Sequence, residues 1–351
     1  MKNKQIEKGI RGLQETQISP AEKQAILAHL METIKDTRTA PQRSWGVFIF
    51  DQFIWRQRFS QVVAVCLILL MLSGGTLYAS ETALPGDLLY PIKINIMEPA
   101  GDILAVSLSD KTKREVEKVS RRLSEAEKLA SEGRLSSNNV QVIKKQLDAQ
   151  TDKFNRLTTG LAKTVSLEEI ADIHSNFEAQ ITAHAHILQE VSDHAQDSQK
   201  TIIAELAKEV DKKIDFAKKD TSKIESKLAE KRSQSDENDR QIFEKNKQEV
   251  KNKIKNTQRQ LDKDYRNAKG LTKDILENAS GTLNEAQKKI EEAEESNRSG
   301  KGNEALNSLF SANRDTEEAR TSVKKSKDFK QSPADRNEKE KVQKNKDRQR
   351  N

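Results

Sequence analysis

The sequence predicts an all-α protein with one transmembrane helix, elongated helical hairpins or a coiled coil on the outer side, and a disordered basic C-terminal tail. Three observations predict it. One long run carries no charge, although 33% of the 351 residues are charged and only 34% are hydrophobic. Elsewhere, apolar residues recur at alternating spacings of three and four, the pattern of packed helices. Gly and Pro number only 13 and 6, which favours helices. A chain so poor in hydrophobic residues builds thin helical bundles more readily than a thick core.

The uncharged run extends over 22 residues, from Phe59 to Ser80. About 20 apolar residues in a helix span a hydrocarbon core of roughly 30 Å, so residues 59–80 are predicted to cross the membrane. A buried core helix is disfavoured because the remaining chain is too poor in apolar residues to cover it. A cleaved signal peptide is disfavoured because 58 residues precede the run and Leu77 stands where cleavage after Ala79 needs a small residue. An uncleaved anchor is expected.

Charges on either side of the run predict its direction. Residues 1–58 carry ten Lys and Arg against six Asp and Glu, whereas the residues just after the run are mainly acidic. The positive-inside rule therefore predicts a single-pass protein of the cell membrane with a cytoplasmic N-terminus and an extracytoplasmic C-terminal region. Aromatic and basic side chains flank a spanning helix at headgroup level, where they contact membrane lipid. The predicted anchor residues are Trp45, Trp55, Arg56, Arg58 and Tyr78.

Composition and pattern divide the chain into five predicted segments. They are a short cytoplasmic helical segment with an aromatic and basic flank (1–58), the transmembrane helix (59–80), an extracytoplasmic helical domain (81–232), charged helices that include a hairpin (233–329) and the disordered basic tail (330–351). The apolar seams of the outer helices also predict a homo-oligomer formed through a coiled coil.

Local signals predict where the outer helices begin and end. Gly can close a helix in the left-handed conformation, and Ser followed three residues later by Glu can open one. The predicted elements are a helix over 109–132 closed by Gly133, a second helix from about Ser137, a long helix opened by the capping box of Ser166 and Glu169 with a break near 192–200, and a hairpin of 272–296 with 303–326.

A compact motif follows the membrane run directly. It comprises Leu84, Pro85, Gly86, Asp87, Leu89, Tyr90, Pro91 and Lys93. Pro-Gly-Asp is turn chemistry, and Asp87 can cap the helix that follows. The motif resembles the Leu-Pro-Gly-Asp-x-Leu-Tyr-Pro-x-Lys hallmark of a family of bacterial extracytoplasmic domains of unknown function. The stretch Glu115–Leu135, rich in Arg, Leu, Ala and Glu, is also similar to that family.

The resemblance covers roughly residues 20–200. It implies a single-pass protein, in some members with an anti-sigma-factor-like inner segment, and it implies no established activity. Residues 97–101 depart from the family pattern, because Met-Glu-Pro-Ala-Gly is expected to interrupt the helix after Lys93. The motif has two interpretations: a recognition surface, or a turn that leads the chain from the membrane into the first outer helix. The turn is favoured.

No catalytic constellation occurs: the sequence has no phosphate-binding loop, no nucleophile elbow and no His-Glu-x-x-His helix. His174, His184, His186 and His194 are the candidate metal ligands. Helical metal pairs use spacings of three or four, whereas His184 and His186 are two apart and His184 falls on the apolar stripe, as a partly buried seam histidine would. The only cysteine, Cys66, lies in the membrane run. No catalytic, cofactor-binding or metal-binding residue is predicted.

The positive charge lies at the two ends of the chain. Residues 321–351 carry eleven basic against five acidic residues, and the whole chain has a net charge of +7. Nucleic acid is therefore not an expected partner. The leading hypothesis is a non-enzymatic envelope protein whose outer helices contact a partner and signal inward to a cytoplasmic regulator at residues 1–58. The alternative is an envelope scaffold or spacer whose basic tail binds an anionic polymer.

Overall fold

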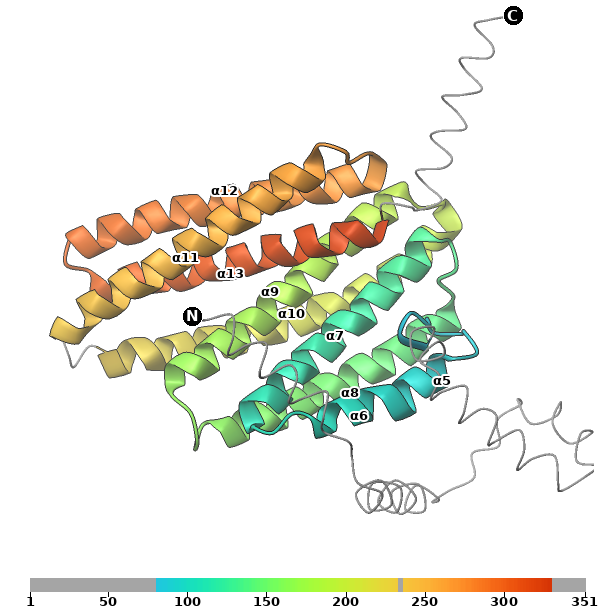
Figure 1. Cartoon of the computed structure of the whole chain (residues 1–351), viewed down its shortest axis with the longest axis horizontal. Helices are drawn as coiled ribbons and strands as arrows, with labels where there is room; N and C mark the ends of the chain where they lie inside the picture. Colours follow the sequence, from blue (N-terminus) through green and yellow to red (C-terminus); the bar gives the residue numbers. More distant parts are fainter. Residues whose placement is uncertain (1–79, 233–235, 330–351) are drawn as a thin grey trace, which may run out of the picture. The chain divides into compact units, whose positions relative to one another are not determined.

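The computed structural model describes residues 80–232 and 236–329 (Figure 1). Within these ranges the protein is all-α: eight helices, α6 to α13, pack together, and no strand occurs. This confirms the helical part of the predicted fold class. Residues 59–79 of the predicted span, the cytoplasmic segment 1–58 and the tail 330–351 lie outside the described ranges. None of the described helices is long and apolar enough to cross a membrane.

The described chain runs through short helical turns into long helices. The short elements are α5 (Tyr90–Ile92), the π-helical turn η2 (Lys93–Met97) and α6 (Glu98–Ile103). The long helices are α7 (Leu108–Ser131), α8 (Ser137–Leu161), α9 (Leu167–His194), α10 (Asp197–Arg232), α11 (Asp236–Tyr265), α12 (Gly270–Arg298) and α13 (Gly302–Lys325). A 3₁₀ turn, η3 (Ser326–Phe329), closes the described chain.

The ends of α7 follow local chemistry. Ser107 and Asp110 form a reciprocal capping box at its start. At its end Gly133 adopts φ +67°, its N–H bonds the Ala130 carbonyl at 3.0 Å, and the N–H of Arg134 bonds the Leu129 carbonyl at 2.8 Å. This is the Schellman pattern, which satisfies carbonyls that have no partner further along the helix. The predicted stop at Gly133 is confirmed.

The predicted start and break of the next helices are also found. Ser166 caps α9 by accepting a hydrogen bond from the Glu169 N–H at 3.2 Å. The reciprocal half of that predicted capping box is replaced, because the Glu169 carboxylate accepts instead from the Ser109 hydroxyl at 2.6 Å. The helical path breaks between His194 and Asp197, where Ala195 is extended. The predicted hairpin corresponds to α12 and α13.

The expected interruption at residues 97–101 is not an interruption. The chain stays helical from Tyr90 to Ile103, and Pro99 lies in the first turn of α6. A proline has no N–H and clashes with the carbonyl four residues earlier in a regular helix. The π turn just before it widens the path, with the Glu98 N–H reaching the Lys93 carbonyl five residues back. Helical geometry therefore accommodates a residue that the sequence suggested would end it.

Two apolar clusters hold the helices together. The first is centred on α7 to α10, with Leu123, Phe154, Phe177 and Leu206 among its buried members, and it also includes residues of later elements, namely Leu271, Ile275 and Phe329. The second joins α11, α12 and α13. Helix α13 also contacts earlier helices through ion pairs; Arg314, for example, lies 3.3 Å from Glu178 of α9 and 2.8 Å from Glu225 of α10. Segments far apart in the sequence thus share one packed body.

Replacement by alanine is expected to change the free energy of unfolding in opposite directions at two glycines. Gly133→Ala places a Cβ on a left-handed residue and should lower the free energy of unfolding by about 1 kcal/mol. Gly281 lies inside α12 with no atom near the position of an added Cβ. Gly281→Ala should therefore raise the free energy of unfolding by about 0.5–1 kcal/mol. Urea unfolding followed by helical circular dichroism measures both, and two shifts of the same sign would contradict the left-handed end of α7 at Gly133 or the helical position of Gly281.

Candidate functional site

The family-like motif lies against a buried ion network centred on Arg122 of α7. The Arg122 side chain is fully buried, and its guanidinium bonds to Glu98 of α6 and lies 3.2 Å from Glu125. It also donates to the Tyr90 hydroxyl at 2.8 Å and to Gln146 at 2.9 Å. Helices α6, α7 and α8 and the motif are therefore joined at one cation. Removing a charge from water costs several kcal/mol, which only fixed partners of opposite charge offset.

Two motif residues enter this network. The Lys93 ammonium lies 2.5 Å from Glu125 and donates to the Ala83 carbonyl at 2.9 Å. Burial lowers the pKa of Lys93, and the Glu125 carboxylate opposes that shift. The Tyr90 hydroxyl lies 3.0 Å from Glu125 and 2.8 Å from Gln146, and burial raises the pKa of that phenol. These contacts fix the start of the helical path on α7 and α8.

The remaining motif residues form the turn before it. The Asp87 carboxylate accepts from the Leu84 N–H at 2.8 Å and lies 2.8 Å from Arg134, and Gly86 has φ +98°. Leu84 and Pro85 are buried, Leu89 is half-buried and Pro91 is exposed. These placements favour the turn interpretation. The predicted anchor residues Trp45, Trp55, Arg56, Arg58 and Tyr78 lie outside the described residues.

The four candidate histidines face different partners. His186 lies 2.9 Å from Glu318 of α13, His194 lies 3.1 Å from Asp274 of α12, and His174 packs edge-on to Phe154. His184 is completely buried rather than partly buried, and its ring nitrogens are both bonded. Among residues 80–232 and 236–329, no group of three or more potential ligands could hold a metal ion.

His184 forms a chain of three polar side chains between α7 and α9. Its Nε2 lies 2.7 Å from the Ser120 hydroxyl and its Nδ1 lies 2.5 Å from Glu127. Hydroxyl, imidazole and carboxylate in this order can activate a nucleophile. Acyl transfer also needs donors for the oxyanion, and Ser120 lies inside α7, where the backbone N–H groups are used by the helix. The arrangement fits a satisfied buried histidine better than a catalytic centre.

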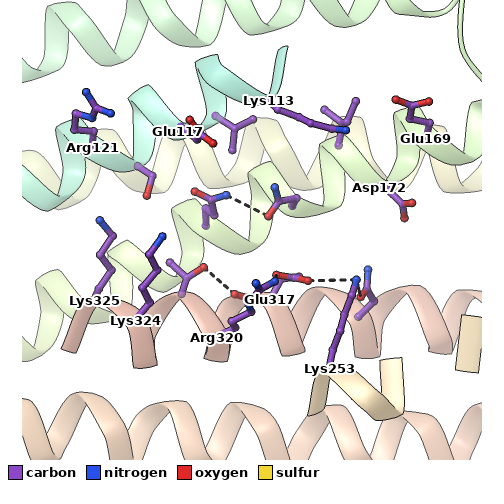
Figure 2. A pocket seen from close by; sticks show the side chains of 17 residues that line it. Lys113, Glu117, Arg121, Glu169, Asp172, Lys253, Glu317, Arg320, Lys324 and Lys325 are labelled. Carbon is purple, nitrogen blue, oxygen red and sulfur yellow. Dashed lines mark hydrogen bonds and ion pairs between the residues drawn. The ribbon is translucent and has the colours of Figure 1, made fainter. Parts of the chain in front are cut away.

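A charged cleft lies where α7, α9, α11 and α13 meet (Figure 2). It encloses about 770 Å³. Six basic and four acidic side chains line it, giving a formal charge of +2. They are Lys113, Glu117 and Arg121 of α7, Glu169 and Asp172 of α9, Lys253 of α11, and Glu317, Arg320, Lys324 and Lys325 of α13.

Charge is unevenly placed along the cleft. In Figure 2, Arg121, Lys324 and Lys325 lie toward one end, and Glu169 and Asp172 lie toward the other. Between these ends, Glu317 pairs with Lys253 at 3.3 Å and with Arg320 at 3.2 Å. Within the described residues, Lys324 and Lys325 make no ion pair. The basic end can therefore accept a phosphate or carboxylate group.

None of the cleft residues was predicted from the sequence. One signal was present, since Lys113, Glu117 and Arg121 follow at intervals of four and so share one helix face. The partner face on α13 lies some two hundred residues later in the chain. No local pattern says that these two faces meet.

The fold and the site define an all-α bundle of helices with a water-accessible, charged cleft. No family model matches the chain, and neither the curated proteins nor the solved structures contain a match.

Protonation of His186 and of His174 is expected to change the stability of the protein in opposite directions. The hydrogen bond to Glu318 raises the pKa of His186, so its stabilisation is fully present below about pH 6.5 and is lost as pH rises through the folded pKa. Burial lowers the pKa of His174, so the unfolded chain binds that proton first and stability falls as pH drops below about 6.5. Each substitution should therefore change the pH profile in its own direction.

The measurement is urea unfolding of the wild type, His186→Gln and His174→Leu at pH 5.5 and pH 8.5. The loss caused by His186→Gln should be larger at the acidic pH. The stability of His174→Leu should decline less than that of the wild type on acidification. Equal effects of His186→Gln at both pH values would show that the Glu318 contact carries no charge.

Proposed function

We propose that the protein is a non-enzymatic, single-pass protein of the bacterial cell envelope whose outer helices form a recognition region. The charged cleft is the observation that carries the recognition part of this proposal, and the predicted span carries the membrane part. A ligand in it would touch helices from both ends of the described chain, α7 and α13, and so would bind only the assembled fold. Its basic end favours a ligand with phosphate or carboxylate groups.

Binding is a better account of the cleft than catalysis. Ser120 is the cleft residue that bonds to the His184 imidazole, which in turn bonds to Glu127, and it is buried with a relative exposure of 7%. Its neighbouring backbone N–H groups belong to α7. Arg121, Lys324 and Lys325 instead offer donors at an open surface, which suits a ligand that is held and not transformed.

The geometry also supports inward signalling. Arg121 faces the cleft and lies 3.5 Å from Glu98, while the next residue, Arg122, bonds to the same carboxylate. An anion bound by Arg121 would compete with Glu98 and so perturb the network that holds Lys93. That lysine follows the predicted span by thirteen residues. Residues 1–58 would be the output, bound to a transcription regulator as the resemblance to anti-sigma-like proteins suggests.

Inorganic polyphosphate is a suitable anionic probe for the full chain in detergent micelles. The triple variant Arg121→Gln, Lys324→Gln, Lys325→Gln should bind it at least 10-fold more weakly, measured by titration calorimetry. The matched control is Lys145→Gln, Lys227→Gln, Lys288→Gln. It removes three exposed cations outside the cleft, so the net charge changes equally. The control should weaken binding by less than about 3-fold, because distant exposed charges are screened by salt.

Equal weakening by both variants would contradict recognition at the cleft and favour a diffuse charge effect, as the scaffold alternative with its basic tail expects. The proposed inward signalling is tested separately in a pull-down that uses residues 1–58 as bait. Recovery of a transcription regulator supports signalling, and recovery of none favours the scaffold.

A further inference from the structure

The helical path from Tyr90 to Ile103 has its charges on the inner side. Lys93 and Glu98 are buried, with relative exposures of 3% and 6%, and both bond to α7. Asp102 is half-buried and lies 2.5 Å from Lys118 of α7. All three charged residues between positions 88 and 106 therefore point at the helical body. A surface helix of a soluble protein normally has the reverse arrangement.

Apart from Asn95, the exposed residues of the same stretch are apolar. Five of the six large hydrophobic side chains that are exposed in the described residues lie here, and the sixth is Phe216. The five are Leu88 (93% exposed), Ile96 (49%), Ile103 (76%), Leu104 (79%) and Val106 (91%), here called the apolar strip. No exposed residue from 88 to 106 is charged, in a chain that is 33% charged.

Such a strip favours an occupant other than water. Hydrophobic side chains exposed singly are ordinary, but a contiguous group marks contact with a protein or a membrane. The absence of charge on this face gives no means of selecting a charged partner. An uncharged apolar face fits the boundary between lipid headgroups and acyl chains, where interfacial helices lie.

The position of the strip in the chain identifies the membrane as the occupant. Leu88 follows Ser80, the last residue of the predicted span, by eight residues, which reach at most about 29 Å when fully extended. The contact of Lys93 with the Ala83 carbonyl further ties the helical path to the residues just after the span. A face so close to the bilayer surface is held there by the chain itself.

We propose that the apolar strip rests in the outer surface of the membrane, with the path from Tyr90 to Ile103 lying along it. The strip then places the helical body directly on the bilayer. Binding of lipid at the strip is separate from ligand binding at the cleft. The inference rests on the proposed membrane anchor, so the experiment must distinguish loss of the anchor from loss of this contact.

The test uses the full chain in vesicles of phosphatidylcholine and phosphatidylglycerol. With Cys66→Ser as background, Leu104→Cys receives an environment-sensitive nitrobenzoxadiazole label. The matched control is Asp197→Cys at the start of α10, where the native side chain is fully exposed. Spin-labelled lipid should quench the label at position 104 at least 3-fold more strongly than the label at 197. Iodide in the water should show the opposite order.

Each other outcome overturns the inference in a distinct way. If the protein floats with the vesicles but the label at 104 is quenched by iodide and not by lipid, the anchor stands and the strip does not touch the membrane. If that label is shielded from both quenchers, a protein surface covers the strip, either a second copy or residues 1–79. If the protein does not float, the anchor and the inference fail together. Val106→Cys should behave as Leu104→Cys does.

Discussion

The buried guanidinium of Arg122 is the constraint on which the arrangement near the predicted membrane boundary depends. A charge inside a protein is tolerated only where its partners are fixed in place. Glu98, Glu125 and Tyr90 provide those partners, and each belongs to or contacts the path from Tyr90 to Ile103. Because that path must turn its charges toward α7, its apolar side chains are left on the outside.

Helix α7 lies between the charged cleft and the path that carries the apolar strip. Arg121 faces the cleft and Arg122 faces the buried network, so consecutive residues of α7 touch different environments. Glu98 lies between them and contacts both. A ligand at the cleft and the lipid surface at the apolar strip would therefore be separated by one shared carboxylate. This short path is the physical basis for the proposed coupling between the outer region and the membrane.

Helix positions could be predicted wherever the determining signal is local. Gly133 ends α7 and Ser166 opens α9, because each acts on residues within one or two turns. The contacts of Arg314 with Glu178 and Glu225 could not be predicted, since they depend on how remote helices pack. The cleft follows from that packing, as does the bonding of His184 to Glu127. The interruption expected at Pro99 was wrong because proline disrupts a regular α-helix, whereas the turn that precedes it is a π turn.

Hydrogen exchange of the full chain, followed by mass spectrometry, tests the role of Arg122 most directly. In Arg122→Met, peptides that cover residues 88–106 should lose protection selectively, while those of α12 and α13 stay protected. The neighbouring Arg121→Met removes a side chain that is 38% exposed and reaches Glu98 only at 3.5 Å, so residues 88–106 should lose much less protection than in Arg122→Met. Unchanged protection of residues 88–106 in Arg122→Met, or equal loss over the whole described chain, would contradict the account.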